Sequence, residues 1–217
     1  MKQTEVKIGE WLTQGFSLYR DNFLILLLTT AIAIACTFAS FGLLFGPLGA
    51  GVFLIALRLQ DGESPKPEVG EVFKGFENFG QTFLCSLSIF AAYIIGGSIF
   101  EMIPLVGGLF SIVWNIALGA ATIFALAIVA DEKIDFWPAI LKSYNIVRQD
   151  PLPFAVFSLL LGLISASGLI VLFVGVVLTA PIYFASISVA YRDVVTPRID
   201  AEQEVDGVEE RKKAANI

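Results

Sequence analysis

The sequence predicts an all-α polytopic transmembrane protein with six helical spans, arranged as three hairpins. Only 16% of its 217 residues are charged, whereas about a quarter are charged in a typical soluble domain. The mean hydropathy is +0.79. Four stretches contain no Asp, Glu, Lys or Arg, and each exceeds the roughly 20 apolar residues that a membrane helix needs. These observations indicate a membrane protein.

The lengths of the charge-free stretches predict the number of spans. They cover residues 22–57, 78–100, 102–130 and 151–191. The first and last are roughly twice as long as one span, so each is expected to fold back at the glycines and prolines near its middle. The two shorter stretches are joined by a turn that contains Pro104. The predicted spans are 23–41, 44–60, 79–100, 105–130, 153–171 and 174–191.

An amphipathic stretch precedes each predicted hairpin. Its apolar residues recur at spacings of three and four, which is typical of a helix with one apolar face. Aromatic residues are frequent on these faces, as in helices that lie in the headgroup layer. We therefore expect three interfacial helices on the cytoplasmic side. Their apolar faces comprise Ile8, Trp11, Leu12, Gly15, Phe16 and Tyr19; Val69, Val72, Phe73, Phe76 and Phe79; and Phe136, Ile140, Leu141, Tyr144 and Val147.

Matching landmarks suggest that the chain contains three copies of one unit. An aspartate, Asp61, Asp131 or Asp193, follows the second span of each hairpin. The units cover roughly 5–61, 69–131 and 135–193, within a membrane domain of residues 1–195. An even number of spans in each unit would give all three the same orientation and permit a pseudo-threefold arrangement. The alternative is that any chain of hairpins shows such landmarks. The interfacial helices match at Gly15-Phe16, Gly75-Phe76 and Ser143-Tyr144.

The positions of lysine and arginine predict the orientation in the membrane. All 14 lie in the N-terminal segment, the loops 58–77 and 131–150, or the C-terminal tail. Because positive residues are retained on the cytoplasmic side, both termini are expected to be cytoplasmic, in a cell (inner) membrane. The Arg192-Asp193 and Arg58-x-x-Asp61 pairs are interpreted as interfacial charges. The acidic tail, 196–217, is expected to be disordered.

The composition excludes many kinds of chemistry. Without histidine there is no imidazole for a Ser-His-Asp triad, a haem or a zinc site. Cys36 and Cys85 both lie in apolar stretches, so no disulfide framework or CxxC motif is expected. The spans lack paired aspartates, and the chain lacks a phosphate-binding glycine loop. We therefore expect no enzyme activity, no cofactor and no bound metal, and no binding of nucleic acid.

Few polar residues lie within the predicted spans. Glu101, at the turn between the middle spans, could be a cation or proton site, but a turn residue in water or headgroups is the favoured interpretation. Asn115 lies near the middle of the fourth span and could line a polar path together with hydroxyl groups. The favoured alternative is that Asn115 forms a hydrogen bond with a neighbouring helix. The candidate hydroxyl residues are Thr29, Thr30, Ser111 and Thr122, beside Trp114.

The C-terminal part of the chain is similar to a known group of membrane proteins. The motifs are Phe136-Trp137-Pro138-Ala139-Ile140-Leu141-Lys142-Ser143-Tyr144, Pro181, Ala190-Tyr191-Arg192-Asp193 and, further upstream, Ile103-Pro104-Leu105-Val106-Gly107. They resemble uncharacterised bacterial six-helix integral membrane proteins, the domain-of-unknown-function families that resemble the membrane domain of glycerophosphoryl diester phosphodiesterases. The resemblance implies the architecture only, because a catalytic phosphodiesterase barrel would need about 200 further residues.

The leading functional hypothesis is a non-enzymatic, membrane-organising or accessory protein. The alternative is a facilitative transporter of a small neutral or amphipathic solute, with a path near Asn115; an enzyme of lipid metabolism ranks third. The expected partner is the lipid bilayer, and the faces of small residues would allow a homo-oligomer or contact with another membrane protein. The geometry of any cavity distinguishes the first two hypotheses, because a transporter needs a polar-lined pocket that reaches the middle of the membrane.

Overall fold

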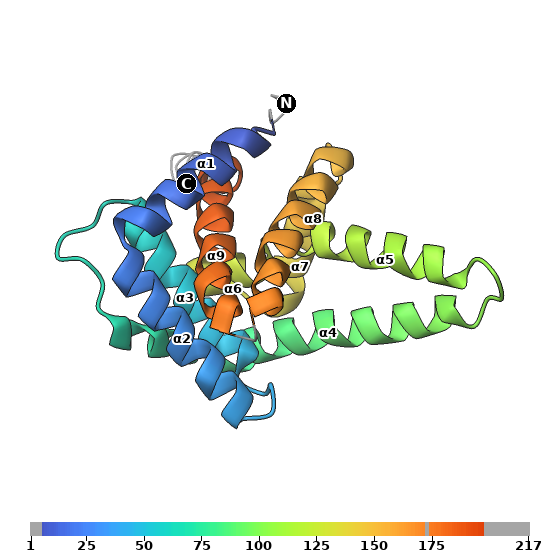
Figure 1. The fold of residues 1–217 in the computed structure, drawn as a ribbon, viewed down its shortest axis with the longest axis horizontal. Coiled ribbons are helices and arrows are strands. Elements are labelled where there is room, and N and C mark those ends of the chain that lie inside the picture. Colours follow the sequence, from blue (N-terminus) through green and yellow to red (C-terminus); the bar gives the residue numbers. More distant parts are fainter. Residues whose placement is uncertain (1–5, 172–173, 198–217) are drawn as a thin grey trace, which may run out of the picture.

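The computed structural model describes residues 6–171 and 174–197, and every regular element within them is a helix (Figure 1). The predicted all-α class is therefore confirmed. Most of the predicted acidic tail lies outside the described residues. The elements are α1 (Ile8–Asp21), α2 (Phe23–Ala39), α3 (Phe45–Gln60), η1 (Val69–Phe76), α4 (Phe79–Glu101), α5 (Gly107–Ala121), α6 (Ala125–Glu132), α7 (Phe136–Val147), α8 (Pro151–Ser167), η2 (Gly168–Val171) and α9 (Val174–Val194), of which η1 and η2 are 3-10 helices.

The structure contains three to five candidate membrane spans. Three segments are long and apolar enough to cross a membrane: α4, the combined α5 and α6 over Gly107–Glu132, and Gly175–Val194 of α9. Two bent pairs raise the number to five, since α1 meets α2 at 94° and α7 meets α8 at 112°. Taken alone, α2, α3 and α8 have 17, 16 and 17 residues, slightly fewer than a full crossing requires. The six-span count stays a prediction.

The predicted fourth span, 105–130, is interrupted in the structure. Residues 122–124 form a turn between α5 and α6, although they include neither glycine nor proline. Ser143 of α7 explains the break. Its buried hydroxyl donates a hydrogen bond to the carbonyl of Ala121 (2.8 Å) and accepts one from the amide of Phe124 (3.3 Å). These bonds partly replace the helical hydrogen bonds that the turn removes.

Each amphipathic helix packs against a helix from another predicted unit. A Cβ on Gly15 of α1 would lie 2.6 Å from the Cα of Ser186 in α9, and one on Gly75 of η1 would lie 1.9 Å from the carbonyl oxygen of Pro47 in α3. Such approaches require residues without a side chain. α7 makes the corresponding contact at the α5–α6 junction, through Ser143. The three landmark positions of the sequence are therefore three points of close contact.

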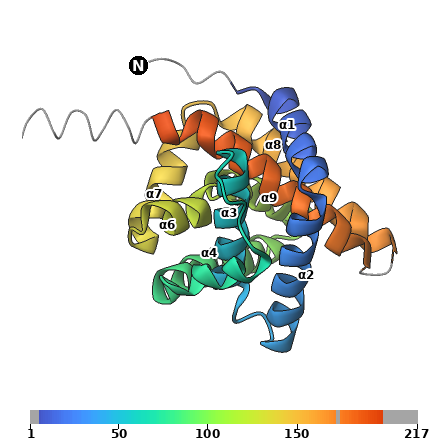
Figure 2. The ribbon, with the colours of Figure 1, turned by 90° about the vertical axis from the view of Figure 1, so that its left-hand side faces the viewer.

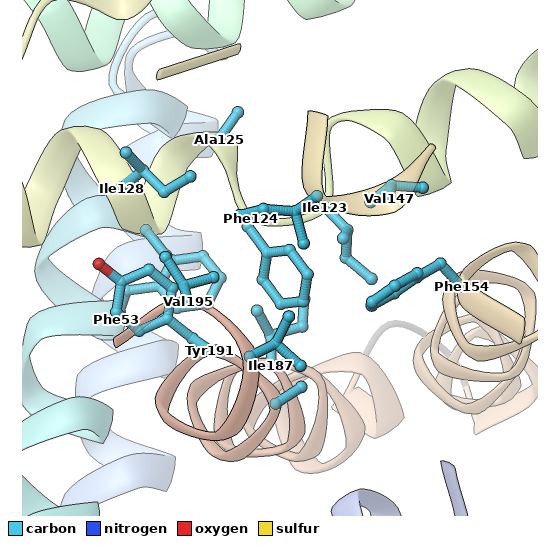
Figure 3. Close-up of a cluster of buried hydrophobic side chains, with 14 of the residues drawn as sticks. Phe53, Ile123, Phe124, Ala125, Ile128, Val147, Phe154, Ile187, Tyr191 and Val195 are labelled. Atoms are coloured by element: carbon cyan, nitrogen blue, oxygen red, sulfur yellow. The ribbon is translucent and has the colours of Figure 1, made fainter. Parts of the chain in front are cut away.

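The centre of the molecule is filled by aromatic and aliphatic side chains, mainly from α6, α7, α8 and α9, with Phe53 of α3 (Figure 3). The Phe124 ring meets that of Phe154 edge to face at 5.8 Å, and Trp11 stacks on Phe154 at 6.0 Å. Nearly every residue of α3 is buried. Figure 2 shows the reason, because α3 lies between α2 and the α6–α7 pair.

The α4–α5 hairpin projects away from the other helices (Figure 1). Only 11% of the most apolar 18-residue segment of α4 is buried. The two helices are joined by a hydrogen bond from the indole of Trp114 to the carbonyl of Ala92 (3.1 Å). Because the exposed residues of this hairpin are largely apolar, it is compatible with a hydrocarbon environment.

Candidate functional site

A cavity of about 980 Å³ lies between the base of the α4–α5 hairpin and helices α2, α3, α8 and α9. Its volume is at the upper end of the range of ligand-binding pockets, about 300–1,000 Å³. Phe53, Phe83 and Phe184 are among its lining residues, and most of the lining is apolar. The lining residues Phe90 and Leu163 are 61% and 59% exposed. The cavity is therefore open to the surroundings of the protein.

A small polar region lies on the α5 wall of the cavity. The side-chain oxygen of Asn115 is buried and has no hydrogen-bond partner among the described residues. Gly119 follows one turn later on the same face of α5. A Cβ on Gly119 would lie 2.7 Å from the hydroxyl of Tyr93 in α4 and 3.1 Å from that of Ser158 in α8. Glycine thus leaves space where hydroxyl groups from two other helices approach α5.

The unpaired oxygen of Asn115 has an energetic consequence. Burying a polar group without a hydrogen bond costs about 1–3 kcal/mol. Since this oxygen is buried even in the empty cavity, the amide of Asn115 would have to rotate to present it to a ligand with an O–H or N–H group, and that hydrogen bond would remove the cost. The cavity lining includes no charged residue, so it offers no partner for an ionic head group. The geometry therefore suits an uncharged molecule with an apolar body and a hydrogen-bond donor.

The structure brings together only some of the residues singled out in the sequence. Asn115 and Thr122 both line the cavity, and the hydroxyl of Thr122 donates to the carbonyl of Leu118 (2.8 Å). Thr29 and Thr30 are buried in α2, and their hydroxyls have no partner among the described residues; neither lines the cavity. Glu101 is exposed at the end of α4, also away from the cavity.

Sequence reasoning did not single out Tyr93 or Ser158. Tyr93 does provide a signal, because tyrosine in a membrane protein is usually found at the interfaces, whereas this one lies near the middle of α4. Ser158 provides none, since single serines are frequent in membrane helices. Only the packing of α4 and α8 against Gly119 shows that both belong to the cavity.

A second polar cluster lies at the ends of α3, α6 and α9. The guanidinium of Arg192 donates two hydrogen bonds to Asp61, of 3.0 and 2.7 Å, and one of 3.0 Å to Asp131. Tyr191 also donates to Asp131 (2.9 Å). Asp193 instead accepts from the indole of Trp11 (2.8 Å). The interpretation of Arg192 and Asp193 as interfacial charges stays a prediction; in the structure both make contacts with other helices.

Arg58, which the sequence also suggests to be an interfacial charge, belongs to a cluster around Glu71. Arg58 pairs with Glu63 (2.5 Å) and with Glu71. Glu71 also accepts hydrogen bonds from Lys74 (2.7 Å) and from the backbone amide of Glu68 (3.2 Å). The bond from Lys74, aided by those from Glu68 and Arg58, outweighs desolvation and lowers the pKa of Glu71 from 4.5 to about 2. This cluster joins η1 and α3.

Among the described residues, no group of three or more His, Cys, Asp or Glu side chains is placed to hold a metal ion. Within the same part of the chain, the lining of the cavity includes no Asp, Glu, Lys, Arg, His or Cys, and its titratable groups are the phenols of Tyr93 and Tyr183. Comparison with known proteins finds no match to a family model, to a curated protein or to a solved structure.

Proposed function

We propose that this non-enzymatic membrane protein binds an uncharged amphipathic molecule in the cavity beside Asn115 and acts as a facilitative transporter for it. The observation that supports the proposal best is the buried, unpaired oxygen of Asn115 beside a large and mostly apolar cavity. If the amide served only to join helices, its oxygen would be expected to have a partner. The cavity is mostly apolar rather than the polar-lined pocket expected of a transporter, so it supports binding of an amphipathic molecule; transport is a further step of the proposal, and the membrane-organising role remains the alternative.

The topology that we propose has six spans in three hairpins, with α1, η1 and α7 on the cytoplasmic side. The bends of 94° between α1 and α2 and of 112° between α7 and α8 support it, because a helix lying in the interface meets a span nearly at a right angle. The contacts of α1 with α9, η1 with α3 and α7 with the α5–α6 junction form a closed cycle among the units. This cycle supports the proposed pseudo-threefold repeat and the six-helix resemblance.

The binding proposal is tested with a fluorescent probe, a monoacylglycerol with a nitrobenzoxadiazole group at the end of its acyl chain. We expect saturable binding to the purified protein in lipid nanodiscs. Asn115→Leu should weaken binding about fivefold, since a hydrogen bond contributes about 1 kcal/mol. The matched control is Asn145→Leu, at an exposed position of α7 outside the cavity. The methyl ester of the same acyl chain has no donor and should bind Asn115→Leu and the unmodified protein alike.

Filling the cavity provides a second arm of the test. Gly119→Leu should abolish probe binding, because its side chain would occupy the space in front of Tyr93 and Ser158. Gly80→Leu is the control, since Gly80 is exposed, has no atom within 4 Å of an added Cβ and does not line the cavity. Transport requires further that vesicles containing the protein exchange the probe between leaflets faster than protein-free vesicles. Equal binding by all variants would rule out the cavity as the site.

A further inference from the structure

Phe41 has an unusual backbone conformation at the end of α2. Its φ angle is +53°, in the left-handed region that glycine favours and bulky residues rarely adopt. Two hydrogen bonds define the turn, from the amide of Gly42 to the carbonyl of Thr37 (2.8 Å) and from the amide of Phe41 to that of Phe38 (3.1 Å). This is the Schellman pattern of a helix end, in which Phe41 occupies the position usually held by glycine.

Phe41 lies at the rim of the cavity described above. Its side chain is 97% exposed, yet Phe41, Gly42, Leu43 and Phe45 all belong to the cavity lining. The ring is therefore almost free of contacts with the described residues, although Phe41 belongs to the cavity lining. The left-handed backbone favours glycine, so neither it nor packing requires an aromatic side chain here. An exposed apolar ring at a membrane surface lies against the lipid headgroups, and this one also lies beside the cavity.

Leu105 provides an internal comparison. It lies in the turn between α4 and α5, has a φ angle of +70° and is fully exposed. It differs from Phe41 in one respect, because Leu105 does not line the cavity. Replacing either residue with glycine relieves the same kind of backbone strain. Only the replacement of Phe41 changes the mouth of the cavity.

We infer that Phe41 is a lid residue, whose ring closes over an uncharged amphipathic molecule bound in the cavity and slows its release. This inference rests on the proposed function. The turn 40–44 joins two predicted spans, so it is expected at the membrane surface, where water reaches the exposed ring. Rotation of the side chain toward the cavity would bury the ring against an apolar ligand, and removal of apolar surface from water is favourable. The left-handed backbone places the ring at the rim from which this rotation can occur.

The experiment measures how fast the fluorescent monoacylglycerol leaves the protein in nanodiscs, by stopped-flow chase with unlabelled monoacylglycerol. Phe41→Gly should raise the dissociation rate at least about threefold and leave the association rate within about twofold, as is usual when bound-state contacts are removed. Phe41→Tyr, which keeps the ring, should release the probe at the unmodified rate. Leu105→Gly, the matched control, should also release it at that rate.

Thermal unfolding separates the lid from a structural role. Phe41→Gly and Leu105→Gly should each unfold at the same or a higher temperature than the unmodified protein, since both relieve strain. Faster release from a protein that is at least as stable supports the lid. An unchanged dissociation rate in Phe41→Gly, with normal binding by the unmodified protein, would overturn the lid and leave the proposed function standing. Absence of saturable binding by the unmodified protein would overturn both.

Discussion

Arg192 and Asp61 are joined by two parallel hydrogen bonds although they are 131 positions apart in the sequence. Paired bonds between a guanidinium and a carboxylate fix both distance and orientation. Through them the end of α9 is held against the end of α3, and a third hydrogen bond from Arg192, to Asp131, holds α6. Arg192→Lys keeps the positive charge but loses the planar guanidinium that donates both hydrogen bonds to Asp61. We expect it to lower the free energy of unfolding in detergent by about 1 kcal/mol, because the pair is partly exposed.

The control for this substitution is Arg148→Lys, at an exposed position at the end of α7. The same conservative change should leave stability within about 0.5 kcal/mol there. Equal unfolding midpoints for the two variants in a chemical denaturation series would show that the paired hydrogen bonds of Arg192 contribute nothing to the packing of α9.

The break between α5 and α6 predicts a strong effect of removing one hydroxyl group. Ser143→Ala would leave the carbonyl of Ala121 and the amide of Phe124 without their side-chain partner. We expect a loss of about 1–3 kcal/mol, the cost of unsatisfied buried polar groups. Ser167→Ala, at an exposed serine that bonds only within its own helix, is the control. Thermal unfolding that does not distinguish the two variants would contradict this account of the break.

Glycine packing in η1 gives a prediction with a control in the same helix. Gly75→Ala should destabilise the protein by about 1–3 kcal/mol, the usual cost of overpacking, because the added Cβ would overlap the backbone of Pro47. Backbone atoms cannot move aside as side chains do. Gly70→Ala, where an added Cβ meets nothing within 4 Å, should be neutral or slightly stabilising. Circular dichroism during heating would compare the two, and the reverse order of stability would disprove the close approach.

The lowered pKa of Glu71 predicts a stability difference that depends on pH. Folding lowers the pKa from 4.5 to about 2, so the folded state favours the ionised form. The resulting stabilisation is fully present above the unfolded pKa and is lost as the pH falls from about 4.5 to about 2. Glu71→Gln lacks this contribution. At about pH 6 the unfolding temperature of Glu71→Gln should therefore lie below that of the unmodified protein. As the pH falls toward about 2, the two unfolding temperatures should converge.

A Glu10→Gln variant provides the comparison for that titration, since Glu10 is exposed and its one ion pair within the described part of the chain is with Lys7, at 3.6 Å. Its unfolding temperature should follow that of the unmodified protein across the whole pH range. If the unfolding temperatures of Glu71→Gln and the unmodified protein differ by the same amount at every pH, the ionised carboxylate of Glu71 is not the source of the extra stability.

The proposed orientation predicts which cysteines can be labelled from outside the cell. In a background lacking Cys36 and Cys85, a cysteine at Lys74 or Lys142 should be protected from an impermeant maleimide in intact cells. A cysteine at Glu101 should react, because the predicted turn at 101–104 lies on the opposite side of the membrane. Labelling after cell disruption controls for access. Reaction of the Lys74 or Lys142 positions in intact cells would overturn the assignment of cytoplasmic loops.

The sequence predicts the helix boundaries well where local chemistry determines them. The predicted spans 44–60 and 79–100 differ from α3 and α4 by one residue at one end, since charges, glycine and proline mark these ends. The interruption at 122–124 was not predicted, because its cause is Ser143, a residue of a different helix. A hydrogen bond from a distant residue does not alter the spacing of apolar residues in the segment that it bends, so the sequence of that segment does not reveal the bend.

The cavity was only partly predictable for the same reason. Asn115 stands out in the sequence because an amide in the middle of an apolar stretch is costly unless it is satisfied. Its proximity to the hydroxyls near Gly119 depends on how α4, α5 and α8 meet. Thr29 and Thr30 looked equally suitable in the sequence, but α2 directs them into a buried contact outside the cavity. The spacing of residues along one helix does not reveal which neighbouring helix packs against each of its faces.

The packing of α1 against α9 has a consequence for how the chain is assembled during synthesis. Gly15 has its close neighbour in Ser186, and the indole of Trp11 bonds to Asp193, 182 positions further along. The contacts of Gly15 and Trp11 therefore form only after α9 has been made, whereas Tyr19 of α1 packs with residues of α2 and α3, which are made earlier. Until then this part of the apolar face of α1 must rest elsewhere, and the membrane surface is the nearest place for it. Synthesis of α9, rather than insertion of any one earlier hairpin, completes the packing of α1.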